Sequence, residues 1–295
     1  MTLSQEHLQA PAEVLEESPP RAMAESVIEP VTGFSLPPPS IFSSNVDLIY
    51  FLARRDVVAR YKQTKFGLLW VVIQPALMAV VFSIFLGGIA RVPTGDDVPY
   101  PVFAITGLTL WVAFTMVLTR SSTSVVDGIA LVSKVFFPRI LIPVASSLAP
   151  VVDFVLAFAV AVISMLLFGV IPSPRIILTP IPVGLTVLLA VGMGLWFSAL
   201  NVRYRDVGTG VQVIVQLGLF VTPIIYPASL VPERLHYLYA LNPLVGIFEL
   251  YRWAVLPEAG APGFAVVYST LCTLVLLVTG AAYFQRAQSR FADYI

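Results

Sequence analysis

The side chains that could carry chemistry in this sequence are few, and their spacing does not match a catalytic site. The two histidines, His7 and His236, cannot form a histidine metal cluster, and the single cysteine, Cys272, excludes a disulfide framework. Neither a phosphate-binding loop of the type G-x-x-x-x-G-K-S/T nor a G-x-S-x-G elbow occurs. Gly192 and Gly194 lie inside an apolar run, which is more typical of close helix packing than of nucleotide binding. The sequence therefore predicts a chain without catalytic residues, metal or cofactor of its own.

Asp153 is the one ionisable residue deep inside a long apolar run. Such residues in membrane spans often mark an ion or substrate path. A proton-coupled carrier usually has several of them, however. A structural role, in which Asp153 pairs with a neighbouring helix, is therefore the alternative interpretation.

The elements that carry these residues are predicted to lie in lipid. Hydrophobic residues make up 58% of the 295 residues, charged residues 12%, and the mean hydropathy is +0.88. Because a soluble globular protein has about 25% charged residues, this much apolar surface indicates a membrane protein. The net charge of zero argues against a nucleic-acid partner.

Uncharged runs long enough to cross the bilayer as helices recur along the chain. The second half of the chain also holds a mostly apolar segment, Glu233–Glu258, which Pro243 and Pro257 interrupt. We expect this segment to form short re-entrant helices, because irregular backbone at membrane depth must be buried in protein or line a cavity. The predicted fold is all-α, with a transmembrane domain over residues 66–295 and six spans at about 66–90, 98–119, 140–171, 176–202, 207–230 and 259–285.

The basic residues predict the orientation. With the N-terminus inside, only Arg91, Arg175, Arg234 and Arg252 fall on the outer side, which leaves 13 of the 17 Lys and Arg residues inside. Basic residues favour the cytoplasmic side, so we expect both termini in the cytoplasm and the chain in the plasma (inner) membrane.

The region before the first span divides in two. Residues 1–42 are rich in proline and glutamate, a composition that predicts a disordered cytoplasmic tail. Residues 43–65 predict an amphipathic helix, which Ser44 or Asn45 can cap and whose apolar residues recur at helical spacing. We expect this helix to lie along the cytoplasmic membrane surface with its arginines at the headgroups.

The loop between the second and third spans predicts a second short helix on the same side. The residues from Ser121 to Ser124 can cap it, it would run through Asp127 to Lys134, and Pro138 would end it.

Three blocks of this sequence resemble the ABC-2-type permeases that export polysaccharides. The first is Arg54–Trp70, followed by Gln74-Pro75 at the entry to the first span. The second is Asn201-Val-Arg-Tyr-Arg-Asp206, which leads to Val221-Thr-Pro-Ile-Ile-Tyr-Pro227. The third is Leu241-Asn-Pro243 with Glu249 and Tyr251-Arg252. The blocks follow one another at the family's spacing, and the resemblance covers residues 43–290.

The resemblance implies a homodimer of this chain bound to two copies of a separate ATPase subunit. ATP and Mg²⁺ would bind to that partner, and hydrolysis would drive a lipid-linked polysaccharide, such as an O-antigen or a capsule, teichoic-acid or cell-wall glycan, across the membrane. The family's coupling helix corresponds to residues 122–134 and its N-terminal interface helix to residues 45–62. The residues expected to couple to the ATPase are Ser124, Asp127, Leu131, Lys134, Arg54, Arg55 and Arg60.

The family's gate helices correspond to residues 232–256, where aromatic and charged residues gather. A glycan has hydroxyls and apolar sugar faces, which suit aromatic rings with a polar handle. Tyr and Trp at this depth are also ordinary residues of the membrane-interface belt. Glu249 and Arg252, at i and i+3, could form a latch or an exposed ion pair of little energetic worth. The residues expected to form the outer gate and line the channel are Tyr226, Tyr237, Tyr239, Glu249, Tyr251, Arg252 and Trp253.

Two other classes of function are open. A gradient-driven secondary transporter or flippase of lipid-linked sugars would need internal repeats or several membrane-embedded ionisable groups, and the sequence shows neither. A membrane enzyme acting on lipid-linked sugars would need clustered charges on the outer loops. The acidic pair there, Asp96-Asp97, lies between Gly95 and Pro99 as in an ordinary turn.

Overall fold

The fold was analysed in a computed structural model, which describes residues 36–62, 67–94, 98–129, 137–235, 239–257 and 259–291. All of them belong to one unit, Val31–Ile295. Most of the predicted tail lies outside the described residues, as do Leu131, Lys134 and Tyr237. The end of that tail differs from the prediction, because a short helix begins at Ser40.

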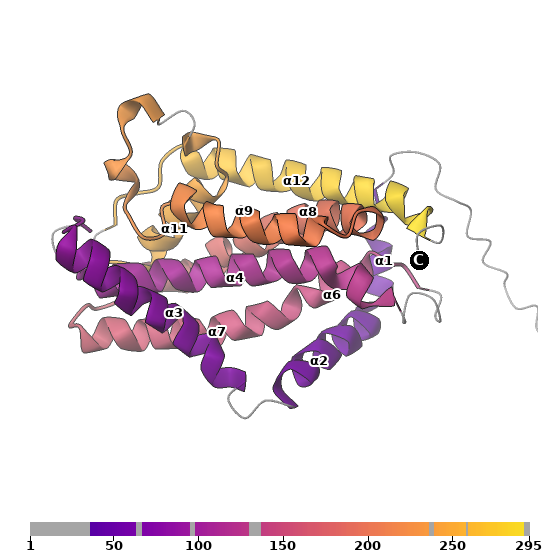
Figure 1. Cartoon of the computed structure of the whole chain (residues 1–295), viewed down its shortest axis with the longest axis horizontal. Coiled ribbons are helices and arrows are strands. Elements are labelled where there is room, and N and C mark those ends of the chain that lie inside the picture. The colour runs from indigo at the N-terminus through magenta and orange to yellow at the C-terminus, as the bar shows by residue number, and fades with distance from the viewer. Residues whose placement is uncertain are drawn as a thin grey trace, which may run out of the picture. The chain divides into compact units, whose positions relative to one another are not determined.

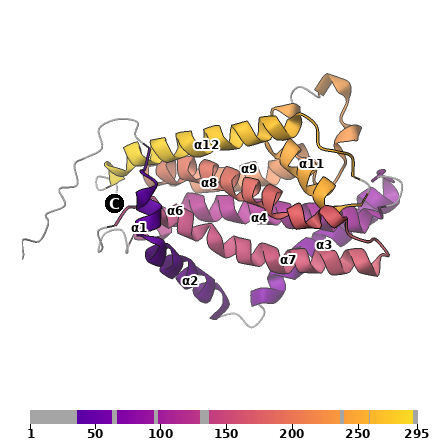
Figure 2. The same cartoon turned by 180° about the vertical axis from the view of Figure 1, so that it is seen from behind.

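Within the described residues every regular element is helical (Figures 1 and 2), as the sequence predicts. The α-helices are α1 (Ser40–Ser44), α2 (Val46–Lys62), α3 (Gly67–Phe82), α4 (Tyr100–Asp127), α6 (Leu141–Ser146), α7 (Leu148–Leu167), α8 (Pro180–Arg203), α9 (Val207–Val221), α11 (Leu244–Val255) and α12 (Ala265–Gln288). A π-helix, η1 (Ser83–Ile89), follows α3, and the 3₁₀ turns are η2 (Pro174–Leu178), η3 (Ala228–Leu230) and η4 (Glu233–Leu235).

Five stretches of the described chain are long and apolar enough to span a membrane, which makes it a multi-pass membrane protein. The fifth predicted span, residues 207–230, is helical only from Val207 to Val221, where α9 ends after 15 residues. A helix of that length measures about 22 Å, short of the roughly 30 Å of the hydrocarbon core. Helical backbone is disfavoured before a proline, and Pro223 follows two residues later. The five stretches are Leu69–Ile89, Tyr100–Asp127, Leu141–Leu167, Pro174–Arg203 and Ala265–Gln288.

Helix α4 is the central element of the bundle. It packs against α3, α6, α7, α8 and α9, and 78% of its apolar window is buried, compared with 17% for Leu69–Ile89 and 22% for Ala265–Gln288. In both views, α1, α6 and the end of α12 lie at one end of the helices, whereas α11 and the segment before it lie toward the other (Figures 1 and 2). We call the first the basic end, because Arg203 at the end of α8 and Arg286 and Arg290 at the end of α12 lie there. We call the second the outer end, after the orientation predicted from the sequence.

The second short cytoplasmic helix was predicted wrongly at its start. Helix α4 continues without a break to Asp127, and the serines near its end do not cap a new helix. Ser122 Oγ donates to Leu118 O at 2.8 Å, and Ser124 Oγ donates to Ser121 O at 2.8 Å. Serine hydroxyls that return to carbonyls of the preceding turn are compatible with a continuing helix. A helix, by contrast, is observed where the amphipathic helix was predicted, as α2 within residues 43–65.

Close packing of α8 against α12 depends on glycine, as the sequence indicates for Gly192. A Cβ at Gly192 would lie 2.7 Å from Leu277 N, and a Cβ at Gly280 would collide with Gly192 O. Small residues at such crossings let two backbones approach closely in a membrane.

Replacement of Gly280 by alanine is therefore expected to destabilise the chain by about 1–3 kcal/mol, since the added methyl group must push two backbones apart. The loss should be measured as a lower unfolding temperature of the detergent-solubilised chain. Gly184→Ala in α8 is the matched control, because nothing lies within 4 Å of a Cβ there. Equal unfolding temperatures for the two variants would contradict the packing interpretation.

Candidate functional site

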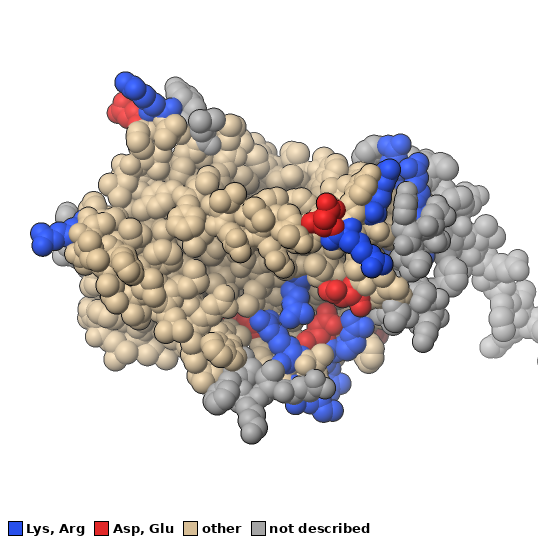
Figure 3. Space-filling view, in the orientation of Figure 1, with Lys and Arg blue, Asp and Glu red and all other residues tan. Residues whose placement is uncertain are grey.

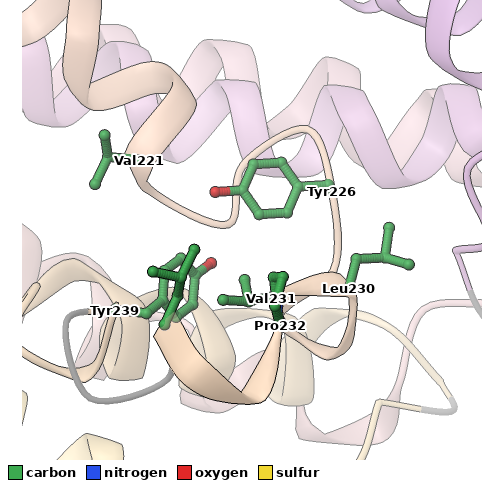
Figure 4. A pocket seen from close by; sticks show the side chains of 7 residues that line it. Val221, Tyr226, Leu230, Val231, Pro232 and Tyr239 are labelled. Carbon is green, nitrogen blue, oxygen red and sulfur yellow. The ribbon is translucent and has the colours of Figure 1, made fainter.

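The outer end holds two pockets. The larger, which we call the outer pocket, has a volume of about 780 Å³, and its walls include Phe103, Glu249 and Arg252. The smaller, which we call the tyrosine pocket, has a volume of about 360 Å³, and the rings of Tyr226 and Tyr239 lie on its facing sides (Figure 4).

One stretch of chain, which we call the clamped segment (222–227), separates the two pockets. Pro223 and Pro227 line the outer pocket, whereas Tyr226 lines the tyrosine pocket. The segment follows α9 directly, and Ile224 and Ile225 within it are buried. Movement of this segment would change both pockets together.

Three side chains from other elements hold the clamped segment by hydrogen bonds. Arg252 Nη2 of α11 donates to Ile224 O at 2.8 Å, and Tyr100 Oη of α4 donates to Ile225 O at 2.6 Å. Asn242 Nδ2, just before α11, donates to Thr222 Oγ1 at 2.9 Å. The clamped segment is therefore tied to α4 and to α11.

Arg252 is the most unusual of these three side chains, because it is charged and only 9% exposed. Its guanidinium carbon lies 3.8 Å from the centroid of the Phe103 ring, a cation–π contact. Burial lowers the pKa of Arg252 to about 10, so the side chain remains charged at neutral pH. Gly107 provides the space, since a Cβ there would lie 2.6 Å from Ile224 O and 3.4 Å from Arg252 Nη2.

The latch proposed between Glu249 and Arg252 does not form in the structure. Both residues line the outer pocket, but among the described residues the ion pairs within 4 Å are Arg55–Asp56 and Arg60–Asp153. The reason is that the guanidinium of Arg252 turns toward the clamped segment and Phe103 instead. Burial raises the pKa of Glu249, and the charge of Arg252 offsets part of this effect without a direct ion pair.

The other predicted gate residues occupy different positions. Tyr226 Oη donates to Phe220 O at 2.8 Å, and burial raises the pKa of both Tyr226 and Tyr239, so both phenols are neutral at physiological pH. Tyr251 is fully buried in the core, 6.3 Å from the ring of Phe158, and lines neither pocket.

Trp253 serves the end of α11 rather than a pocket. The guanidinium of Arg175 lies 4.8 Å from the centroid of its ring and also donates to Pro257 O at 3.0 Å. A second hydrogen bond, from Arg175 Nε to Ser173 Oγ at 2.8 Å, fixes the arginine. Trp253 therefore anchors α11 to the turn before α8.

Tyr100 and Asn242 belong to the site but were not among the predicted site residues. A signal for Asn242 was present, because asparagine before proline is typical of a helix start. Asn242 Oδ1 accepts a hydrogen bond from Leu244 N at 3.0 Å, at the beginning of α11. No signal marked Tyr100, because its partner carbonyl lies 125 residues further along the chain.

At the basic end, α2, α4 and α6 enclose a cleft of about 310 Å³, which we call the coupling cleft. It brings together four of the residues predicted to contact the ATPase, and it adds Asp56 and Arg120. Arg54 is exposed on α2 and does not line it. The four predicted residues in its lining are Arg55, Arg60, Ser124 and Asp127.

Asp153 of α7 is fixed by two residues of α2. Asp153 is only 3% exposed, and its carboxylate accepts hydrogen bonds from Arg60 and Tyr61. Arg60 Nη2 also contacts Met116 Sδ of α4 at 3.3 Å. Burial, and next the bond to Asp153, raise the pKa of Tyr61 to about 12. Asp153 therefore pairs with a neighbouring helix, as the structural interpretation expects, and that helix is α2.

Comparison with known proteins identifies the family of the chain. Residues 47–256, from the start of α2 to the end of α11, match the model of the family described as ABC-2 type transporter. The chain is 28% identical over 252 residues to an O-antigen export system permease protein of Klebsiella pneumoniae, which covers 84% of this chain and 95% of that protein. It is 25% identical to the corresponding protein of Myxococcus xanthus over the same shares, and 24% identical to a polysialic acid transport protein of Escherichia coli over 78% of this chain and 90% of that protein.

Proposed function

Because the chain belongs to the ABC-2 type transporter family, we propose that it is the membrane permease subunit of an ATP-driven exporter that moves a lipid-linked polysaccharide across the plasma membrane. The observation that carries the proposal is the match over residues 47–256, which includes both the coupling cleft and the clamped segment. The names of the similar export proteins support a polysaccharide as the cargo.

The basic end faces the cytoplasm in this proposal, with both termini on that side. Two ATPase subunits dock onto a homodimer of the chain and contact the coupling cleft. ATP and Mg²⁺ bind on those subunits, which is the division of labour in this family. The cleft offers cationic Arg55 and Arg120 beside anionic Asp127. A surface with charges of both signs favours a protein partner with the complementary charge pattern over a partner with charges of a single sign.

Helix α4 connects the coupling cleft to the clamped segment. Ser124 and Asp127 near its end line the cleft, whereas Tyr100 and Phe103 near its start contact the clamped segment and Arg252. The helix has 28 residues and so extends about 42 Å as one rod. A displacement of its cytoplasmic end by the ATPase would therefore reach the outer pockets through a single element.

The outer pocket and the tyrosine pocket form the outer gate and receive the sugar units. Tyr226 and Tyr239 present rings for apolar sugar faces and neutral hydroxyls for sugar hydroxyls. The contacts of Asp153 with Arg60 and Tyr61 favour a structural role for its carboxylate over that of a proton site in a gradient-driven carrier.

Hydrolysis of ATP tests the proposal. The purified chain in lipid should be inactive alone, and it should co-purify with the ATPase encoded nearest to it and turn over ATP in that complex. A well-folded chain that binds no ATPase subunit would overturn the assignment.

Replacement of Asp127 by lysine should lower glycan-dependent ATP turnover about fivefold, because it reverses a charge at the proposed ATPase contact. Asp206→Lys, an equal reversal at an exposed residue outside the cleft, is the control and should leave turnover unchanged. Equal turnover in the two variants would contradict the placement of the coupling contact.

A further inference from the structure

A fourth cavity, the second at the basic end, has no role in the proposed function. It lies between the end of α8 and the end of α12 and has a volume of about 220 Å³. Three arginines and three aromatic residues share its walls. We call it the arginine cleft, and those residues are Arg203, Tyr204, Tyr283, Arg286, Arg290 and Phe291.

The position of the arginine cleft follows from the pairing of α8 with α12. Gly192 contacts Leu277 and Gly280, and further along both helices Trp196 contacts Tyr283, so α8 and α12 run in parallel and their C-terminal ends lie side by side (Figures 1 and 2). Trp196 of α8 stacks on Tyr283 of α12 with ring centroids 4.2 Å apart. Tyr283 lines the cleft, so the stacked pair joins the two helices directly beside the wall that carries the arginines.

The charge of the arginine cleft suits a phosphate. No carboxylate of the described residues is in its lining, and the two ion pairs of the described chain involve neither Arg203 nor Arg290. Both of these arginines are exposed. Figure 3 shows basic side chains gathered at the end of the helices where α12 ends. Guanidinium groups bind phosphate oxygens with two parallel hydrogen bonds.

The surface that leads to the arginine cleft suits acyl chains. Leu271, Leu274, Val275 and Val278 are between 46% and 60% exposed and form one face of α12 at helical spacing. Arg286 follows Val275 by 11 residues, close to three turns, and so lies on the same face. In a membrane-spanning helix such a face meets lipid tails, which places the headgroup region at the arginines.

We propose that the arginine cleft binds the phosphate headgroup of an anionic phospholipid, whose acyl chains lie along the exposed face of α12. The site does not depend on the proposed export function. Its lipid comes from the leaflet at the basic end.

Binding of defined lipids to the full chain in detergent tests this site. Phosphatidylglycerol should bind at least about fivefold more tightly than phosphatidylcholine with the same acyl chains, because one basic residue contributes roughly that factor at an anionic surface. Arg290→Gln should weaken phosphatidylglycerol binding by a similar factor, and so should Arg203→Gln, which lies on the other helix. Arg205→Gln removes an equal charge outside the cleft and should bind like the unmodified chain.

Several results would overturn the proposal. An equal loss in Arg205→Gln and Arg290→Gln would reduce the effect to general charge attraction. Equal affinities for the two lipids would exclude headgroup recognition. Displacement of phosphatidylglycerol by millimolar inorganic phosphate would assign the site to free phosphate. If Arg290→Gln changes the unfolding temperature of the chain, Arg290→Lys is used in its place. This variant keeps the charge and should retain most of the preference for phosphatidylglycerol over phosphatidylcholine.

Discussion

Replacement of Asp153 by alanine is expected to reduce polysaccharide export and glycan-dependent ATP turnover at least about tenfold, because it detaches the interface helix from the membrane spans. The change leaves Arg60 in a partly buried position without its carboxylate, and breaking a buried ion pair in this way costs about 3–5 kcal/mol. The chain should still insert into the membrane, since the apolar spans are unchanged. Export, turnover and membrane level should be measured together.

Two further variants make this prediction specific. Asp47→Ala removes an exposed carboxylate from the same interface helix and should leave export unchanged. The double variant Arg60→Met, Asp153→Leu removes both charges, and such replacements of a buried pair are often neutral. The double variant should therefore recover stability relative to Asp153→Ala. Additive losses from the two positions would show that Arg60 and Asp153 do not act as a pair.

Replacement of Arg252 by alanine is expected to reduce export at least about tenfold while the ATPase subunit still co-purifies. The change leaves Ile224 O without its buried donor, at a cost of about 1–3 kcal/mol, and removes the contact with Phe103. The clamped segment would then lose one of the ties that hold it between the two pockets. Export should be measured on the cell surface, and ATPase binding by co-purification.

Two control variants test whether the effect depends on the position of the arginine and on its guanidinium group. Arg234→Ala removes an exposed arginine at the outer end and should leave export intact. Arg252→Lys keeps the charge but not the planar guanidinium that stacks on Phe103, so it should rescue only partly. Unchanged export in Arg252→Ala would refute the role assigned to the clamped segment.

The spans could be predicted because lipid imposes a simple rule on composition and length. Apolar runs of 20 or more residues with at most one charge identified the five long spans, and the positions of arginine separated the two ends. The same rule gave too long a helix at α9, where Pro223 rather than polarity determines the end of the helix. The capping prediction for Ser121–Ser124 failed for another reason, because a serine hydroxyl can cap a new helix or bond within an existing one.

The partners of the charged side chains could not be predicted from local spacing. Glu249 and Arg252 are separated by three residues, and this suggested a pair, yet Arg252 bonds to a carbonyl 28 residues away. Asp153 was expected to pair with a neighbouring helix, but the sequence did not identify Arg60, 93 residues earlier. Such partners depend on how helices pack, which no short window of sequence records.

Transport in inside-out membrane vesicles tests the central proposal most directly. Vesicles that contain the chain and its ATPase would be given a radiolabelled lipid-linked polysaccharide, with and without ATP. We expect the glycan to reach the lumen only when ATP and both subunits are present, and collapse of the proton gradient should make no difference. Uptake that persists with an inactive ATPase and stops when the gradient is collapsed would contradict the proposal and identify a gradient-driven carrier.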